Sequence, residues 1–213
     1  MFTGIIETIG EVVDIEKKKS NLLITIKSSI SKELKIDQSV SHNGVCLTVV
    51  DISGNNYSVV AVKETLEKTN LSLLKVGAKI NLERSMLLNG RLDGHLVQGH
   101  IDCTAVVNSI KNENGSWIFS FNIQHSTFNI QHLIIEKGSI CINGVSLTVV
   151  DVISSPSGKS DGASFSVAII PYTYEHTNFK FLKKNAVVNI EFDVIGKYVA
   201  KNLSLHSVFP TQV

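Results

Sequence analysis

The sequence predicts an all-β fold of two similar six-stranded antiparallel barrels, followed by a C-terminal α-helix. Isoleucine and valine are abundant, and helix-forming runs of alanine, leucine and glutamate are scarce, which favours strands. Short apolar segments end in turn residues about every ten positions, a spacing typical of small barrels. The residues from Asn43 to Asp51 recur from Asn143 to Asp151 with a single change, so the chain contains an internal duplication.

The duplication covers most of the chain and indicates its domains. Three further pairs of segments match in the same order: residues 3–8 with 98–103, residues 63–70 with 171–178, and residues 81–83 with 189–191. The offset grows from 95 to 108 residues, as loop insertions would produce. We therefore expect a first barrel over residues 1–96, a second barrel over residues 97–193, and a C-terminal oligomerisation helix over residues 194–213.

Within the first repeat the expected elements are short and closely spaced. Asn43-Gly44 is a hairpin turn signal because both residues tolerate positive φ. The sequence predicts a single helical turn at residues 65–70, a linker between the repeats at residues 86–94, and a long hairpin loop at residues 154–162. Closure into a barrel would remove the two exposed edges of an open sheet. Strands are expected at residues 4–15, 21–27, 39–41, 45–52, 57–62 and 78–82.

From Val194 onward the period becomes helical. An isolated helix of this length is marginal in water, so it must pack either on its own barrels or against copies of itself. One stripe of mainly apolar residues at helical spacing would make this contact, and the polar Lys197, Lys201 and Ser204 fall outside it. The stripe consists of Ile195, Tyr198, Val199, Asn202, Leu203 and His206.

Composition argues against several classes of protein. The formal net charge is +1 with no basic stripe, so nucleic acid is not an expected partner. No apolar run reaches the roughly 18 residues of a transmembrane helix, and the N-terminus lacks the features of a secretory signal. Cys46, Cys103 and Cys141 form no CxxC pair, which argues against a disulfide framework and predicts a reducing, cytoplasmic compartment.

The repeated strand places a small polar residue and a threonine on one face. Val45, Leu47 and Val49 share one side of the first copy, and Cys46 and Thr48 share the other. Ser146 and Thr148 occupy the same face of the second copy. This pattern fits either a fold element whose hydroxyls bond to nearby backbone or a pair of equivalent pockets.

No metal or phosphate-binding motif is present in the sequence. His95 and His100 would point to opposite faces of a strand, and no helix carries a histidine pair beside a carboxylate. No phosphate-binding loop occurs, and no G-x-S-x-G surrounds Ser146. His100 stands out as a single base because it replaces Ile5 of the first repeat. Taken alone, Asp193 is more simply explained as a surface carboxylate at a strand end, and Lys137 as a solvated turn residue.

The motifs taken together resemble a known family. Residues 1–4, 43–48, 63–66, 94–100 and 144–148 are similar to those of riboflavin synthases of the alpha-chain type, and the resemblance covers the whole chain. It implies that each barrel binds one lumazine and that the C-terminal helix joins three chains. The active site would lie where the first barrel of one chain meets the second barrel of a neighbour. The implied reaction dismutates two molecules of 6,7-dimethyl-8-ribityllumazine to riboflavin and 5-amino-6-(ribitylamino)uracil, without a metal or dissociable cofactor.

The resemblance also implies the site residues. His100, Ser146 and Thr148 would transfer protons and polarise the pteridine, and Cys46 and Asp193 would activate or stabilise the adduct at the partner ring. Phe2 and Ser39 match family positions near the site. The first pocket would be lined by Gly4, Ile5, Ile6, Cys46, Leu47, Thr48, Val60, Ala61, Val62, Lys63, Glu64 and Thr65. The second would be lined by Gly99, His100, Ile101, Lys137, Ser146, Leu147, Thr148, Ala168, Ile169, Ile170, Pro171, Tyr172 and Thr173.

Two other functions are compatible with this fold. A non-catalytic lumazine or flavin antenna protein has the same duplication but needs only one working pocket, whereas this chain has polar candidates in both halves. A flavin-dependent reductase barrel is disfavoured because no dinucleotide-binding half follows. The chain departs from the family pattern at Tyr172, where the family has a glutamate, and in the longer loop at 154–162.

Overall fold

The computed structural model describes residues 1–123, 133–153 and 163–206. The first six strands are β1 Thr8–Lys18, β2 Asn21–Lys27, β3 Ser39–His42, β4 Val45–Ser53, β5 Asn56–Ala61 and β6 Lys79–Arg84. The next six are β7 Cys103–Asn112, β8 Trp117–Ile123, β9 Ser139–Ile142, β10 Val145–Ile153, β11 Ser164–Ile169 and β12 Val187–Phe192. The α-helices are α1 Lys63–Lys68, α2 Pro171–His176 and α3 Val194–His206. Short 3₁₀ helices span Ser29–Glu33, Asn70–Leu73 and Asn178–Phe181.

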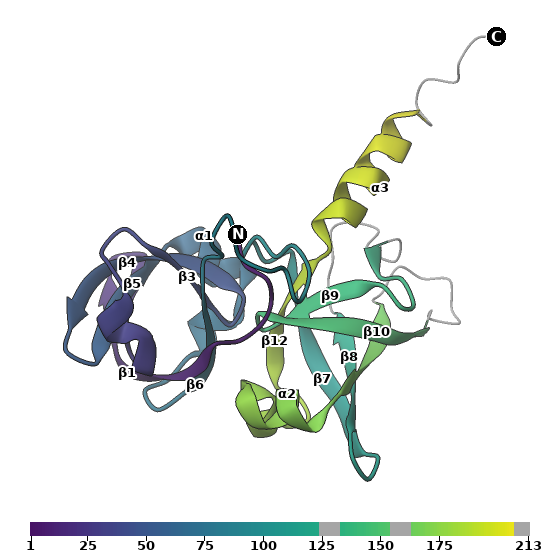
Figure 1. The fold of residues 1–213 in the computed structure, drawn as a ribbon, viewed down its shortest axis with the longest axis horizontal. Helices are drawn as coiled ribbons and strands as arrows, with labels where there is room; N and C mark the ends of the chain where they lie inside the picture. Colours follow the sequence, from purple (N-terminus) through teal and green to yellow (C-terminus); the bar gives the residue numbers. More distant parts are fainter. Residues whose placement is uncertain (124–132, 154–162, 207–213) are drawn as a thin grey trace.

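The strands close into two antiparallel barrels that lie side by side (Figure 1). The order around the first is β1-β2-β5-β4-β3-β6, and the order around the second is β7-β8-β11-β10-β9-β12. The two barrels therefore have the same topology, and the predicted duplicated all-β fold with a C-terminal helix is confirmed. The first strand begins at Thr8 instead of residue 4 because the preceding residues leave the barrel. The predicted 154–162 loop lies outside the described residues.

The repeated hairpin is built as its sequence predicts. Asn43 and Gly44 have φ angles of 48° and 83°, and Asn143 and Gly144 have angles of 47° and 82°. Two successive positive φ angles produce the type of turn that joins β3 to β4 and β9 to β10 without splaying the strands. Each barrel also contains two bulges, which increase the local strand twist and help the sheet to close.

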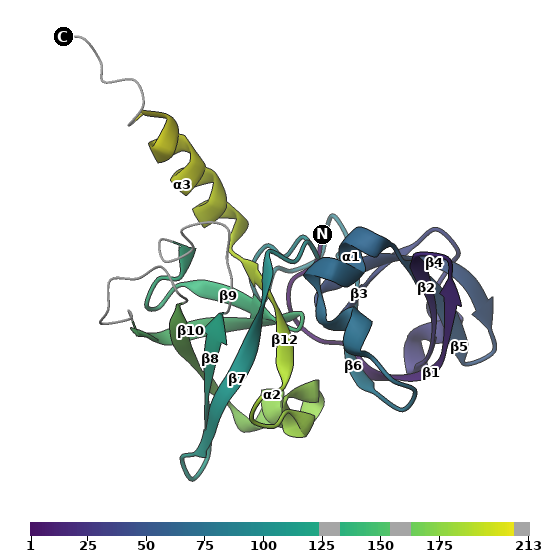
Figure 2. The ribbon, with the colours of Figure 1, turned by 180° about the vertical axis from the view of Figure 1, so that it is seen from behind.

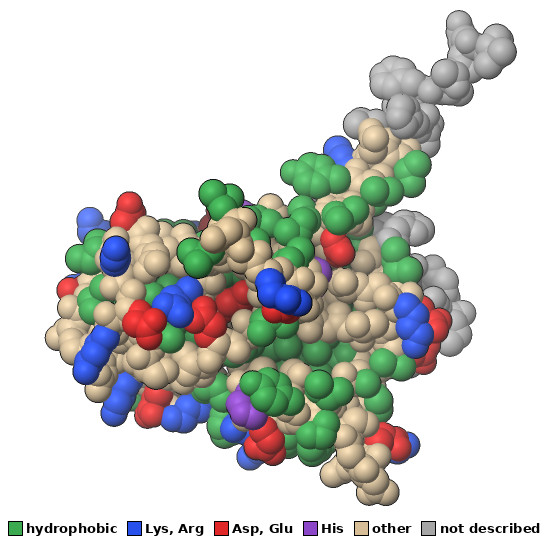
Figure 3. All heavy atoms as spheres, in the orientation of Figure 1, with side chains coloured by type: hydrophobic (Ala, Val, Ile, Leu, Met, Phe, Trp, Pro, Cys, Tyr) green, Lys and Arg blue, Asp and Glu red, His purple; other side chains and the backbone are tan. Residues whose placement is uncertain are grey.

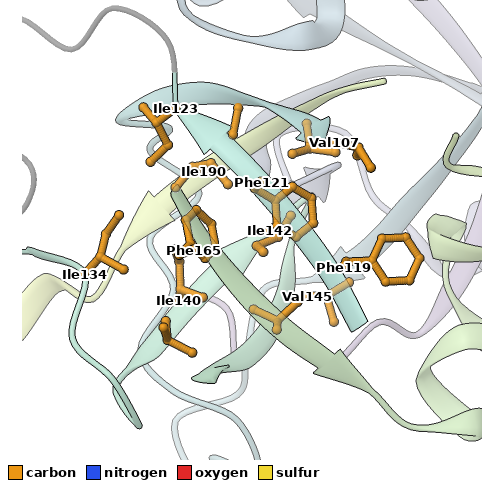
Figure 4. Close-up of a cluster of buried hydrophobic side chains, with 14 of the residues drawn as sticks. Val107, Phe119, Phe121, Ile123, Ile134, Ile140, Ile142, Val145, Phe165 and Ile190 are labelled. Atoms are coloured by element: carbon orange, nitrogen blue, oxygen red, sulfur yellow. The ribbon is translucent and has the colours of Figure 1, made fainter. Parts of the chain in front are cut away.

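The two barrels have differently composed cores. In the first, the buried Tyr57 hydroxyl lies 2.8 Å from Nε2 of buried His42. Phe165 and Ile142 occupy the equivalent positions of the second barrel, where no hydrogen bond is possible. Figure 4 shows the second core, in which aromatic rings from β8 and β11 pack against branched aliphatic side chains. Phe119 and Phe179 also meet edge to face at 5.1 Å between ring centres.

The barrels are joined by a network of buried asparagines related by a pseudo-two-fold axis. Asn81 Nδ2 donates to the carbonyl of Asn143 at 2.9 Å, and Asn189 Nδ2 donates to the carbonyl of Asn43 at 2.9 Å. Gly44 and Gly144 meet on this axis, where a Cβ on either would lie 2.8 Å from the other's backbone nitrogen. The interface is therefore a fixed polar contact, which sets the orientation of one barrel relative to the other. The network comprises Asn43, Asn70, Asn81, Asn143, Asn178 and Asn189.

The predicted helix after residue 193 is present as α3, and it projects away from the second barrel in both views (Figures 1 and 2). Lys197 tethers its base through an ion pair of 2.9 Å with Asp102. Large apolar side chains along the helix are exposed, including Tyr198 at 73% and Leu203 at 65%, and Figure 3 shows hydrophobic groups along its length. Among the described residues, no helix has the length and apolar content needed to cross a membrane.

Candidate active site

The outer face of each barrel contains an equivalent set of side chains. Val45, Leu47 and Val49 point into the first core, whereas Cys46 is half-buried and Thr48 is exposed on the outer face. Ser39 lies opposite Thr48 in the strand register. The predicted division of this strand into an apolar and a polar face is confirmed, and the second barrel repeats it with Ser146, Thr148 and Ser139.

The outer faces continue onto the strand that follows and onto its short helix. Val60 is half-buried and Val62 exposed, and Val62 occupies the N-cap position of α1, which contains Lys63, Glu64 and Thr65. Ala168 and Ile170 are their exposed counterparts ahead of α2, which contains Pro171, Tyr172 and Thr173. Among the remaining predicted lining residues, Ala61 and Ile169 are buried in the barrel cores, and Leu147 packs at the edge of the second core.

Each outer face is covered by a glycine segment from the other half of the chain. The backbone N–H of Cys46 donates to the carbonyl of Gly99 at 2.9 Å, and that of Ser146 donates to the carbonyl of Gly4 at 2.7 Å. A Cβ on Gly99 would lie 2.5 Å from Cβ of Cys46, and one on Gly4 would lie 2.6 Å from Cβ of Ser146. Both glycines have positive φ, so only glycine fits these contacts.

Each half of the chain thus gives a glycine segment to the outer face of the other half, and this exchange changes how the predicted residues group within one chain. Gly4, Ile5 and Ile6 were expected beside Cys46, but Gly4 lies against Ser146 and Ile6 packs on the second core. Gly99, His100 and Ile101 were expected beside Ser146, but Gly99 lies against Cys46 and Ile101 packs on the first core. The pairing arises from contacts between the halves, which a comparison of the repeats does not include.

A buried glutamate in each barrel holds the exchanged segment in place. Glu191 accepts hydrogen bonds from the backbone N–H groups of Gln98, Gly99 and His100 at 2.6, 2.9 and 3.0 Å. Glu83 accepts from N–H and Oγ1 of Thr3, both at 2.7 Å, and from N–H of Gly4 at 3.0 Å. Burial raises the pKa of both carboxyl groups, and these hydrogen bonds oppose that shift.

The N-terminus and the linker run alongside each other between the barrels. Phe2 and Val97 exchange two backbone hydrogen bonds of 2.7 and 3.1 Å. The Phe2 side chain is fully buried with Val97 and Cys141, and Cys46 packs against this cluster. Burial raises the pKa of the Cys141 thiol, which favours its neutral form. Phe2 therefore supports the floor of the first outer face.

His95, which the sequence disfavours as a metal ligand paired with His100, lies directly on the second face. His95 is 8% exposed, and its Nδ1 lies 2.7 Å from Oγ of Ser146. Burial lowers the pKa of His95, and the charge of Asp193 opposes that shift. Asp193 itself caps α3 by accepting from the N–H of Ile195 at 2.9 Å. His95 has no counterpart in the first repeat, so the duplication gave no signal for its role.

The remaining predicted side chains lie at the rim. His100 is exposed beyond the Gly99 contact, and Lys137 is exposed at a corner with φ of 65°. Tyr172 is 70% exposed, and its ring stacks on His176 at 4.1 Å between ring centres. Within the described residues, no three histidine, cysteine or acidic side chains converge as metal ligands would.

Comparison with known proteins identifies what the chain resembles. A family model described as "Lumazine binding domain" matches twice, at residues 3–85 and 98–193. A riboflavin synthase of Actinobacillus pleuropneumoniae is 40% identical over 205 residues, covering 95% of this chain and 90% of that protein. A riboflavin synthase of Bacillus subtilis is 36% identical over 204 residues, covering 95% of this chain and 90% of that protein. Among solved structures, LumP complexed with riboflavin matches with a TM-score of 0.77 at 27% identity, covering 90% of this chain and 99% of that chain.

Proposed function

The chain belongs to the riboflavin synthase family, and from this premise we propose that its two barrels bind two lumazine molecules in one composite active site. Its activity is that of a riboflavin synthase, a transferase. Two molecules of 6,7-dimethyl-8-ribityllumazine react, one donates a four-carbon unit, and riboflavin and 5-amino-6-(ribitylamino)uracil are formed. The observation that supports the composite site is the pair of equivalent outer faces, each with a small polar residue and a threonine beneath a glycine segment.

We propose two half-sites with different chemistry. The first combines Cys46 and Thr48 with His100, which directly follows the glycine that covers Cys46. The second combines Ser146 and Thr148 with Asp193, whose charge acts on His95, and with Lys137, whose backbone N–H donates to the carbonyl of Val149. This grouping moves Asp193 from the Cys46 half-site, where the resemblance implies it, to the Ser146 half-site. The 7-methyl group of the lumazine is acidic because its anion is delocalised into the pteridine ring. The protein therefore needs to supply only modest acid–base assistance and strict alignment of the two rings.

The domains have separate tasks in this proposal. Residues 1–96 and 97–193 each bind one lumazine, and residues 194–213 join the chains. The two outer faces of one chain are each covered by a segment of its other half, and this supports our proposal that the two faces of one active site come from neighbouring chains. The exposed apolar stripe of α3 supports a homotrimer assembled through this helix. Free Cys46, Cys103 and Cys141 support a cytoplasmic location.

A complementation assay tests the composite site. His100→Ala removes a group of the first half-site, and Ser146→Ala removes one of the second. Each variant alone should turn over dimethyl-ribityllumazine slowly. When the two variants are mixed and their subunits exchange, some interfaces combine two intact half-sites, so riboflavin absorbance should recover. No recovery after demonstrated exchange would place both half-sites within a single chain.

The second candidate function is a non-catalytic antenna protein, because LumP structures share the fold. Purified protein mixed with dimethyl-ribityllumazine alone distinguishes the two. The enzyme forms riboflavin without a further reagent and binds two lumazines per chain. An antenna protein binds one lumazine per chain and forms no riboflavin.

A further inference from the structure

His95 is held rigidly beside Ser146 by contacts on three sides. Its backbone N–H donates to the carbonyl of Thr3 at 3.1 Å, and its Nδ1 lies 2.7 Å from Oγ of Ser146. The preceding Gly94 is packed so closely that a Cβ would lie 2.1 Å from the Thr3 oxygen and 3.0 Å from Oγ of Ser146. These contacts fix the backbone at Gly94 and His95 against Thr3 and Ser146, and this backbone places the imidazole beside the serine.

The other ring nitrogen of His95 indicates where the proton resides. Nε2 is buried and has no hydrogen-bond partner within the described structure. A buried N–H without an acceptor is rarer in proteins than a buried lone pair without a donor. Burial also favours the neutral ring. The neutral tautomer with its proton on Nδ1 avoids an orphaned N–H and donates that proton to the Ser146 oxygen.

We propose that His95 is a positioning residue that occupies a lone pair of Ser146 and thereby turns the serine O–H toward the bound pteridine. Ser146 then acts as a hydrogen-bond donor to the ring, because its proton is not needed by His95. The inference rests on the proposed function, in which Ser146 contacts the substrate. Among the described residues, no histidine ring is hydrogen-bonded to Cys46, the counterpart of Ser146, so this arrangement of histidine and hydroxyl belongs to the second half-site.

Three substitutions of His95 test the geometry. The amide of asparagine reaches the position of Nδ1, and that of glutamine reaches the position of Nε2. His95→Asn should therefore retain kcat within about threefold, whereas His95→Gln and His95→Ala should lower it roughly 10- to 100-fold, the usual effect of losing a supporting hydrogen bond. The Kd for riboflavin should change less than kcat, because in this proposal His95 acts through Ser146. Equal loss in all three variants would overturn the proposal.

A double-mutant cycle shows whether His95 acts through Ser146. If it does, His95→Ala should have no further effect on kcat in the Ser146→Ala background. Losses that multiply would instead assign His95 an independent role. Thermal unfolding of each variant identifies those that lose activity through misfolding, and ¹⁵N NMR of the wild-type ring should show a protonated Nδ1 and an unprotonated Nε2. A protonated Nε2 would contradict the proposal.

The wild-type assay separates this inference from the proposed function. A wild-type protein that forms no riboflavin would refute the function itself. An active wild-type protein with an equally active His95→Ala variant would refute only the role of His95.

Discussion

The first and second barrels have the same backbone architecture but different outer faces. Strand order, turns, bulges and the buried glutamates Glu83 and Glu191 are repeated. Differences occur at outward positions, where Cys46 is replaced by Ser146, Val60 by Ala168 and Glu64 by Tyr172, and in the core at the pair His42 and Tyr57. Residues that satisfy the backbone were kept, whereas side chains on the outer faces and in the cores diverged. A duplicated fold has thus acquired two outer faces of unequal composition without changing the strand topology that supports them.

The charge at one corner that both barrels share illustrates this divergence. Asp37 and Lys137 both have positive φ, of 72° and 65°, and both donate their backbone N–H at 2.9 Å to the valine carbonyl at position 49 or 149. The backbone role is therefore identical, whereas the side chains have opposite charge. The second barrel has a cation at the position where the first has an anion, so the two barrels differ in charge at this corner.

The largest predicted effect comes from the two glycines that cover the faces. Gly4→Ala and Gly99→Ala should each lower the free energy of unfolding by about 2–5 kcal/mol, because overpacking adds to the strain of a positive φ. Turnover should fall about a hundredfold, since misplacement by an ångström is enough to disrupt alignment. Urea denaturation and riboflavin formation measure the two effects.

Gly77→Ala is the matched control for these glycine variants. Gly77 has φ of +87°, but nothing lies within 4 Å of a Cβ built there. This substitution should therefore cost only the backbone strain, about 1–2 kcal/mol, with turnover unchanged. If Gly77→Ala were as damaging as Gly99→Ala, close approach between the halves would not explain the glycines.

A smaller effect is expected from the buried glutamates. Glu191→Gln replaces a group that only accepts hydrogen bonds by one that also donates, and its –NH₂ would face backbone N–H groups. We expect a loss of about 1.5–3 kcal/mol in the free energy of unfolding. Glu83→Gln should lose a similar amount, but Glu191→Gln should lower turnover more, because it also displaces His100. Glu113→Gln, in an exposed ion pair with Lys111, should change little. Equal turnover of the two buried variants would contradict the assigned role of His100.

Local patterns in the sequence were enough to predict the fold but not the grouping of the site. The period-two strand from Val45 and the Asn43-Gly44 turn depend on neighbouring residues, so the sequence contains them directly. The contact of Gly99 with Cys46 depends on how two halves pack, and no local pattern encodes it. Asn70 and Asn189 resemble ordinary polar residues in the sequence, although they join the barrels at 2.9 Å. His95 directly follows the linker at a position without a repeat counterpart, so its contact with Ser146 required the structure.

A moderate effect on turnover is expected when the small polar residues are exchanged. Cys46→Ser and Ser146→Cys should each lower kcat roughly 5- to 10-fold, the equivalent of about one hydrogen bond. The double exchange should not restore activity, because His95 lies beside position 146 only. Initial rates of riboflavin formation measure these changes, with circular dichroism to verify folding. Recovery in the double variant would show that the half-sites are interchangeable.

The smallest effect is expected in the cores, where two substitutions give the first barrel the side-chain types that the second barrel has at the same positions. Tyr57→Phe alone removes the partner of His42 Nε2 and should lower the free energy of unfolding by about 1–2 kcal/mol. Adding His42→Ile removes both polar groups, so the double variant should be close to wild type at pH 7.5. Urea denaturation of the three proteins gives these differences, and a double variant less stable than Tyr57→Phe would show that the first core cannot accept the apolar pair.

The same double variant should also alter the dependence of stability on pH. Burial lowers the pKa of His42 from its usual 6.5 to about 4. Between these values the unfolded chain binds a proton that the folded chain does not, so wild-type stability falls as the pH is lowered from 6.5 toward 4. The slope approaches about 1.4 kcal/mol per pH unit from this residue. The His42→Ile/Tyr57→Phe protein lacks the buried imidazole, so its stability relative to wild type should rise as the pH falls through this window. A constant difference between the two proteins from pH 7 to pH 4.5 would mean that His42 is already protonated, or free to become so, inside the first barrel.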